Sequence, residues 1–148
     1  MPEFLAYMIQ FTDIVKSRGY FPSVFLAQSI LESGWGRSPL SRVWNYWGHK
    51  WKPDCGFEYT GKTSNEEING EMIPVRSRFR AYRCIDEAIE AYCDKWEESW
   101  QDGLPKYSPD FSSPAAFIES VAETYATDSN YASKILRIID ELELTQYD

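Results

Sequence analysis

The residue best suited to chemistry is Glu32, which follows a run of apolar side chains. Pro22 suits the first turn of a helix, and the helix predicted from there to about Ser33 is apolar on nearly every side. Gly34 and Gly36 are expected to end that helix. The sequence therefore predicts a carboxyl group at the C-terminal end of a buried central helix.

Three influences are expected to raise the pKa of Glu32. Burial makes an ionised carboxyl costly, the negative end of the helix dipole disfavours a further negative charge, and Trp35 lies near enough to cover it. A carboxyl that keeps its proton near neutral pH can serve as a general acid, for example toward a glycosidic bond. The alternative is a carboxylate in solvent that caps the helix or forms an ion pair. Gln28 lies one turn earlier on the same face as Glu32. A polar side chain on a buried helix needs a hydrogen-bond partner or has a functional role.

The elements that must position Glu32 are mostly helical. Apolar spacing predicts helices over Glu3–Arg18, Pro22–Ser33, Asp86–Trp100, Ala115–Ala126 and Tyr131–Glu141. Residues 61–79 predict a β-hairpin whose second arm contains Pro74 and is therefore an edge strand, whereas residues 53–61 suggest a loop. No internal repeat or linker is visible, so we expect one domain spanning residues 1–148, mostly helical with one small β element.

Composition narrows the function classes. The chain has 148 residues, 43% of them hydrophobic, which is enough for a core of ordinary size. Its net charge of −8 disfavours nucleic acid and anionic membrane surfaces as partners. No stretch is long and apolar enough for a membrane span, and no signal peptide is visible. Aromatic residues make up 16%, a share that suits a ligand with flat, weakly polar faces, such as a sugar.

The cysteines and the one histidine give no metal site. Cys55, Cys84 and Cys93 form no CxxC pair, and their odd number leaves at least one thiol unpaired. We expect buried or idle thiols, with one structural disulfide as the alternative. One histidine, His49, beside scattered cysteines is a poor set of zinc ligands, so we predict neither a metal nor another cofactor.

Four segments resemble glycoside hydrolase family 73, the glucosaminidase domains of bacterial autolysins, flagellar muralytic proteins and phage lysins. Phe21–Ser38 is similar to the core motif of the family, and Asn45–Lys50 resembles its Asn-x-Phe-Gly-x-Lys segment. Phe79–Tyr82 resembles its Phe-Arg-x-Tyr strand end, and Tyr125–Ile135 its Tyr-Ala-Thr-Asp block. The segments occur in the order of the family and cover nearly the whole chain.

The resemblance implies an α+β, mostly helical, lysozyme-like fold, in which a helical lobe and a small β-hairpin lobe flank a groove. The implied reaction is hydrolysis of the β-1,4 bond between N-acetylglucosamine and N-acetylmuramic acid in the glycan strand of peptidoglycan. Glu32 matches the catalytic glutamate of the family, which donates a proton to the leaving oxygen. We expect a monomer that acts at the bacterial cell wall, either secreted or delivered by a phage.

The resemblance also implies further catalytic groups. A second carboxylate is expected on the hairpin, where counting back from Gly70 favours Glu66 and leaves Glu67 open; the alternative is that both are solvated turn charges. Tyr125 matches a tyrosine near the reaction centre, although it could equally be a core residue. Retaining, inverting and substrate-assisted mechanisms all stay open, the last using the N-acetyl oxygen of the substrate as nucleophile.

Five residues are candidates for binding substrate: Gln28, Trp35, Asn45, Trp47 and Tyr131. Trp and Tyr rings can stack on sugars, and an Asn amide can bond an N-acetyl group. Trp47 stands where the family usually has Phe. His49 replaces a usually aliphatic residue; we expect a structural or exposed role for this histidine, and the alternative is a hydrogen bond to substrate.

Three other functions remain open at this point. A muramidase or lytic transglycosylase on the same type of fold would cut on the other side of the disaccharide repeat. A glycan-binding module would keep the groove without turnover, and an assembly protein would use the fold only as a scaffold.

Overall fold

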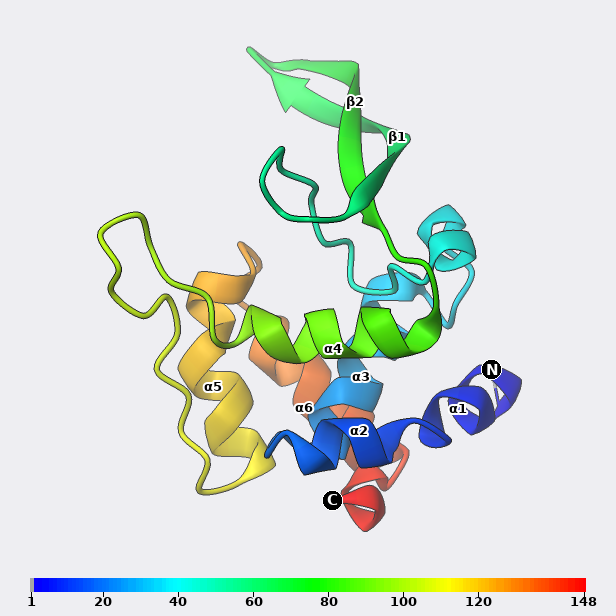
Figure 1. The fold of residues 1–148 in the computed structure, drawn as a ribbon, viewed down its shortest axis with the longest axis vertical. Helices are drawn as coiled ribbons and strands as arrows, with labels where there is room; N and C mark the ends of the chain where they lie inside the picture. Colours follow the sequence, from blue (N-terminus) through cyan, green and yellow to red (C-terminus); the bar gives the residue numbers. More distant parts are fainter. Residues whose placement is uncertain (1) are drawn as a thin grey trace.

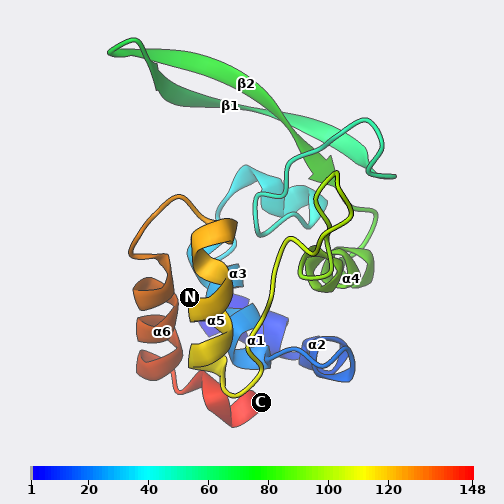
Figure 2. The ribbon, with the colours of Figure 1, turned by 90° about the vertical axis from the view of Figure 1, so that its left-hand side faces the viewer.

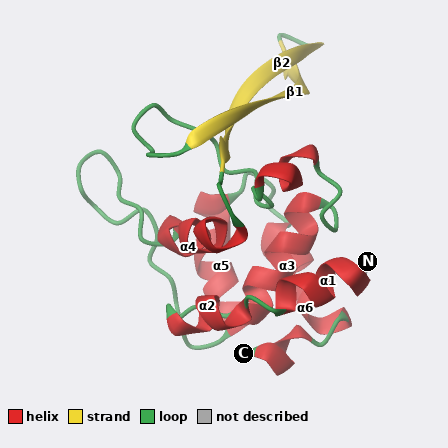
Figure 3. Ribbon diagram, turned by 45° about the vertical axis from the view of Figure 1, so that its right-hand side comes forward, coloured by secondary structure: helices red, strands yellow, loops and turns green. Residues whose placement is uncertain are grey.

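In the computed structural model, which describes residues 2–148, a lobe of six α-helices carries one long β-hairpin (Figures 1 and 3). The helices are α1 (Pro2–Ile9), α2 (Thr12–Ser17), α3 (Pro22–Ser33), α4 (Ile85–Lys95), α5 (Pro114–Tyr125) and α6 (Tyr131–Glu141). The strands are β1 (Glu58–Ile68) and β2 (Glu71–Ala81), and short 3₁₀ helices span Pro39–Val43 and Leu144–Tyr147. The structure thus confirms the predicted α+β, mostly helical fold with a small hairpin lobe.

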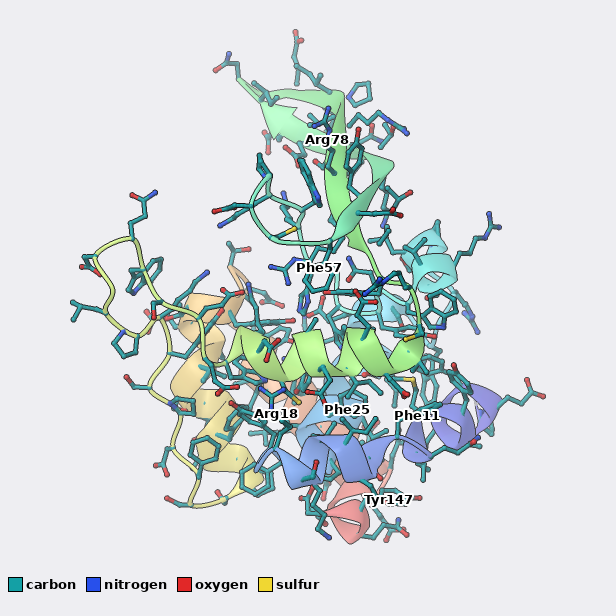
Figure 4. All side chains as sticks on the ribbon, viewed as in Figure 1. Phe11, Arg18, Phe25, Phe57, Arg78 and Tyr147 are labelled. Atoms are coloured by element: carbon teal, nitrogen blue, oxygen red, sulfur yellow. The ribbon has the colours of Figure 1, made fainter. Side chains whose placement is uncertain are left out.

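Helix α3 is the central element of the helical lobe. Its residues from Pro22 to Ile30 are all buried, which confirms the prediction from their apolar character. Phe25 sits in the core, with its ring centroid 5.1 Å from that of Tyr92, and Figure 4 labels it in the middle of this lobe. The first turn of α3 is capped by the carboxylate of Asp148, which accepts hydrogen bonds from the Ser23 amide and hydroxyl at 2.7 Å each.

The chain turns sharply after α3, as the glycines predicted. Gly34 adopts a left-handed conformation (φ 57°) and donates its amide hydrogen to the Ile30 carbonyl. Gly36 also has a positive φ of 77°, and a Cβ there would lie 2.6 Å from the ring of Phe4. Glu32 therefore lies in the last turn of α3, after a segment, Pro22–Ile30, that is buried on all sides.

The predicted single helix over Glu3–Arg18 is wrong, because the structure divides it into α1 and α2. Phe11 leaves the helical region (φ −109°, ψ 6°), and its amide hydrogen bonds three residues back to Met8. The hydroxyl of Thr12 donates to the carbonyl of Ile9 at 2.9 Å and so satisfies an acceptor at the end of α1. The helix predicted over Asp86–Trp100 is likewise too long, since α4 ends at Lys95.

The hairpin pairs antiparallel from Glu58 opposite Ala81 to Ile68 opposite Glu71. Asn69 and Gly70 form its two-residue turn, both with positive φ (52° and 82°), as the right-handed twist of a hairpin favours. The strands are longer than predicted, and the loop expected over residues 53–61 ends at Glu58. Because the sheet has two strands, both are edge strands, and Pro74 is tolerated as predicted.

The base of the hairpin is fastened to the helical lobe by backbone hydrogen bonds. The Trp51 amide donates to the Arg78 carbonyl, and the Arg80 amide donates to the His49 carbonyl, each at 3.0 Å. Phe57, labelled in Figure 4, packs its ring edge-on against Tyr82 where the hairpin meets the lobe. In Figure 2 the hairpin extends from this anchor across the top of the molecule, over α5 and α6.

The cysteines are free thiols: Cys84 is exposed, Cys55 half-buried and Cys93 buried. Burial raises the pKa of the Cys93 thiol to about 12. No helix within residues 2–148 has the length and apolar character to cross a membrane.

Candidate active site

A cleft of about 630 Å³ opens beside the end of α3, below the base of the hairpin. Its walls come from α3, the turn after Tyr46, β2, α4, and the segment that joins α5 to α6. The lining residues are Leu31, Glu32, Trp47, Gly48, His49, Lys50, Lys52, Arg80, Lys95, Glu98, Lys106, Tyr125, Ala126, Thr127, Asp128, Tyr131 and Lys134. The two predicted lobes therefore border one cavity of the size of a small-ligand site.

The carboxyl of Glu32 opens into this cleft from the last turn of α3. The side chain is exposed to the cleft, but the surrounding protein withdraws the carboxyl partly from bulk water, and this desolvation raises its pKa. The neighbouring Tyr131 hydroxyl acts in the opposite direction by favouring the ionised form. Desolvation is the larger influence, so the pKa is raised overall. This is the direction that a general acid requires.

A chain of hydrogen bonds connects Tyr131, in the cleft wall, to the core. The Tyr92 hydroxyl donates to Gln28 Oε1 at 2.6 Å, which leaves Gln28 Nε2 to donate to the Tyr131 hydroxyl at 3.1 Å. The Tyr131 hydroxyl neighbours the Glu32 carboxyl and lowers the pKa of that group. Gln28 is fully buried, so it reaches the cleft only through Tyr131, which forms part of the cleft wall.

Tyr125 lies beside Tyr131 in the same wall, with the two ring centroids 5.5 Å apart. Its hydroxyl oxygen is buried and finds no hydrogen-bond partner within residues 2–148. Burial, followed by the nearby charge of Glu32, raises the pKa of Tyr125 well above its ordinary value. The hydroxyl is therefore a neutral donor near the catalytic candidate, without a partner in the protein.

Trp47 and Asn45 support the cleft floor in different ways. Trp47 is almost fully buried and lines the cleft, and its indole nitrogen donates to Ser29 Oγ on α3 at 3.0 Å. The Asn45 amide nitrogen donates to the carbonyls of His49 and Arg80, while its oxygen accepts from the His49 amide. Asn45 is thus engaged with backbone groups that fix the floor and the hairpin base, and it does not line the cleft.

Trp35 does not line the cleft and so does not cover Glu32. It has a positive φ of 60° and lies in a separate hollow between α3 and α6, beside Ile138 and Leu142. The left-handed turn that ends α3 carries the backbone away from the cleft at this residue.

The hairpin carboxylates Glu66 and Glu67 lie outside the cleft lining, near the hairpin tip. Neighbouring residues on a strand point to opposite faces, so only one of the two can face the helical lobe. Glu66 pairs with Ile73 and shares its face with half-buried residues such as Val75 and Ser64. The face of Glu67 is exposed along most of its length, beginning with Met72 opposite it.

The imidazole of His49 is a cleft residue that sequence reasoning placed in a structural or exposed role. It is buried, its Nδ1 lies 3.1 Å from the Tyr82 hydroxyl, and its Nε2 has no partner among the described residues. Burial, helped by the positive charges of Lys95 and Arg80, lowers the pKa of His49 well below 6.5. The ring is therefore neutral, with one nitrogen still able to form a hydrogen bond.

The cleft is cationic, a property that the sequence did not predict. Six cationic side chains line it, against three carboxylates, although the whole chain carries a charge of −8. Glu98 forms ion pairs with Lys95 (3.3 Å), Lys106 (3.7 Å) and Arg80 (3.9 Å), and Asp128 pairs with Lys134 at 2.6 Å. No local pattern in the sequence signals this, because the cations come from five separate segments.

These ion pairs single out Glu32. Within residues 2–148, it is the one cleft carboxylate with no cationic side chain within 4 Å, so no such pair holds it ionised. The site therefore combines a carboxyl of raised pKa, two tyrosine hydroxyls and an unpartnered imidazole nitrogen in one open cleft. This combination can donate a proton to a bound neutral polar ligand and hydrogen-bond its substituents.

Residues 9–144 match the family described as glucosaminidase, mannosyl-glycoprotein endo-beta-N-acetylglucosaminidase. Among curated proteins, a probable N-acetylmuramidase of Lactococcus lactis is 33% identical over 91% of this chain, which covers 32% of that protein. The exo-glucosaminidase LytG of Bacillus subtilis is 31% identical over 86% of this chain, which covers 46% of that protein. The chain thus spans about a third of the length of the curated relatives it matches first.

Solved structures agree with these matches. The catalytic domain of the autolysin Auto from Listeria monocytogenes superposes with a TM-score of 0.80 at 27% identity, covering all of this chain and 89% of that one. A glycoside hydrolase domain of FlgJ from Salmonella typhimurium gives a TM-score of 0.74 at 27% identity, covering 95% and 96%. Fold and sequence agree with these proteins over nearly the whole length, and the chain belongs to the glucosaminidase family, glycoside hydrolase family 73.

Proposed function

We propose that this chain is a catalytic unit that hydrolyses the β-1,4 bond between N-acetylglucosamine and N-acetylmuramic acid in peptidoglycan, with Glu32 as the general acid. Family membership supports glycoside hydrolysis, and relatives include a peptidoglycan hydrolase, an autolysin and an exo-glucosaminidase. We further propose that it acts as a monomer at the bacterial cell wall, because Glu32, Tyr125 and Tyr131 all line one cleft of a single chain.

The observation that carries the proposal is the state of Glu32: a carboxyl of raised pKa, free of ion pairs, at the edge of a cleft large enough for sugar rings. Its proton is transferred to the glycosidic oxygen as the bond to the leaving sugar breaks. The neighbouring Tyr131 hydroxyl, which favours the ionised form of Glu32, then stabilises the carboxylate that remains.

A second group must meet the positive charge that develops on the sugar ring. One route uses Glu66, whose hairpin would have to bend toward the cleft when substrate binds. The other route uses the N-acetyl oxygen of the substrate as nucleophile, and here the free hydroxyl of Tyr125 is suited to orient the amide. The proposal for Glu32 is common to both routes.

The test compares wild type with Glu32→Gln on purified peptidoglycan. Glutamine keeps the shape of the side chain but has no acidic proton to transfer, so release of reducing ends should fall by roughly 10²- to 10⁴-fold while sedimentation with the wall persists. Glu123→Gln, on the exposed side of α5, is the matched control and should match wild type. Lysis by Glu32→Gln at the wild-type rate would exclude Glu32 as the acid.

Muramidase activity is the second candidate, because several relatives are described as probable N-acetylmuramidases. The two activities leave different sugars at the new reducing end. Reduction of the products with borohydride followed by mass spectrometry should show reduced N-acetylglucosamine. Reduced N-acetylmuramic acid would indicate a muramidase, and an anhydro end a lytic transglycosylase.

A further inference from the structure

The active-site cleft does not end at Glu98. A second hollow of about 600 Å³ adjoins it and shares three of its lining residues, Lys52, Glu98 and Lys106. Its remaining residues, Ser99, Trp100, Gln101 and Asp102, belong to the loop that follows α4. The two hollows therefore adjoin along these three side chains, and together they offer more room for a polymer than the first cleft alone.

Trp100 presents an exposed ring on this loop, and the loop is held in a defined conformation. The ring is 51% exposed although the loop is internally bonded. The Trp100 amide donates to the Leu104 carbonyl at 2.8 Å, and the Gly103 amide donates back to the Trp100 carbonyl at 2.9 Å. The Lys106 amide bonds to the Glu98 carbonyl at 2.9 Å and closes the loop. A fixed, exposed indole beside a cleft is a surface on which a sugar ring can stack.

The charges around the hollow favour an anionic ligand. The Lys106 ammonium lies 5.2 Å from the centroid of the Trp100 ring and 3.7 Å from Glu98, which is shared with two other cations. Lys52 has no carboxylate within 4 Å among residues 2–148. The lining also holds two carboxylates: Glu98, which three cations share, and Asp102, which accepts a hydrogen bond from the Leu104 amide at 3.0 Å. The second hollow thus combines an aromatic face with one ammonium group, that of Lys52, which pairs with no carboxylate of the described residues.

We infer that this second hollow is a binding subsite for an N-acetylmuramic acid residue with its peptide stem: Trp100 stacks on the sugar, and Lys52 and Lys106 bind carboxylates of the stem. The inference rests on the proposed function, because it places the same glycan strand in the same cleft. It adds that recognition depends on the negative charge of the stem and not only on the sugars.

The test varies protein and substrate together. One substrate is peptidoglycan freed of wall polymers by acid; the other is the same material with its carboxylates converted to neutral amides by a carbodiimide and methylamine. Lys52→Gln should raise KM for the unmodified substrate by about tenfold. Its KM for the amidated substrate should stay within about twofold of the wild-type value. Arg137→Gln removes an equal charge from the exposed side of α6 and should change neither.

Trp100 provides an independent arm. Trp100→Ala should weaken the binding of both substrates alike, because stacking does not depend on the carboxylates. Trp100→Phe keeps an aromatic ring and should retain most of the wild-type binding. Equal effects of Lys52→Gln on the two substrates, or no effect on either, would overturn the inference. A lysine effect confined to walls that retain phosphate polymers would overturn it as well, since the occupant would then be that polymer.

Failure of the proposed function gives a different result. If wild type released no reducing ends from either substrate, the hydrolase proposal would fail, and sedimentation with the two substrates would still test the subsite. Loss of binding by Lys52→Gln to unmodified peptidoglycan alone would then support the subsite. Melting temperatures of all variants within a few degrees of wild type would show that folding is not the cause.

Discussion

The Nε2 of Gln28 donates a hydrogen bond to the hydroxyl of Tyr131 over 3.1 Å, joining residues that lie 103 positions apart in the sequence. Gln28 is fully buried in α3 and Tyr131 is the first residue of α6. The Tyr92 hydroxyl fixes the orientation of the Gln28 amide, and the amide in turn holds the Tyr131 hydroxyl in the cleft wall. The tyrosine beside the proposed acid, Glu32, is thus positioned from the core.

Replacing Tyr131 by Phe should move the pH dependence of activity. The hydrogen bond from Tyr131 lowers the pKa of Glu32, so its loss should raise that pKa further. A general acid works while protonated, and the alkaline limb of kcat/KM should therefore shift to higher pH, with a lower maximum. Tyr147→Phe, far from the cleft, is the control. An unchanged alkaline limb would show that Tyr131 does not influence the acid.

Glu32→Gln should stabilise the protein at neutral pH. Burial raises the pKa of Glu32 in the folded state, so between the unfolded and folded pKa values the native protein binds more protons than the unfolded chain. Stability due to this group is lost as the pH rises through that window, and the loss is complete above the folded pKa. Thermal unfolding should show a higher Tm for the variant at pH 7 and no difference below about pH 4. A lower Tm at pH 7 would contradict a net burial cost.

Tyr125→Phe separates a catalytic from a structural role. The hydroxyl is buried with no partner in the described residues, so removing it should leave the free energy of unfolding unchanged or raise it by up to about 1 kcal/mol. If the hydroxyl orients the substrate, kcat should nevertheless fall by at least about tenfold, since such a donor acts only on bound substrate. Full activity in a stable variant would make Tyr125 a packing residue. Tyr59→Phe, on the hairpin, serves as the matched control.

Glu66→Gln and Glu67→Gln form a matched pair on opposite faces of β1. If the hairpin closes over the cleft with its half-buried face inward, Glu66→Gln should lower kcat by more than about tenfold and Glu67→Gln by less than about twofold. The reverse order would assign the second carboxylate to Glu67. Equal and small effects of both changes would favour assistance by the N-acetyl group of the substrate. Initial rates on soluble glycan fragments provide the measurement.

The sequence by itself determined the elements whose signals are local. Pro22 and Gly34 mark the two ends of α3 through backbone conformation, and the apolar spacing of residues 131–141 predicts α6 with the bounds that the structure has. The place of Glu32 at the end of α3 follows from the same signals. Local signals failed where partners are distant, as at the break near Phe11 and in the length of β1, because packing and strand pairing decide these boundaries.

Only the tertiary structure decided the composition of the cleft. Tyr131 and Tyr125 reach Glu32 because α5 and α6 pack beside α3, and Trp35 leaves the site because a left-handed turn carries it to the other side. The cationic lining is invisible in a chain of net charge −8, since its members become neighbours only when five segments fold together. Helix ends are fixed by interactions within a few residues, whereas a binding site is fixed by long-range packing that no short segment encodes.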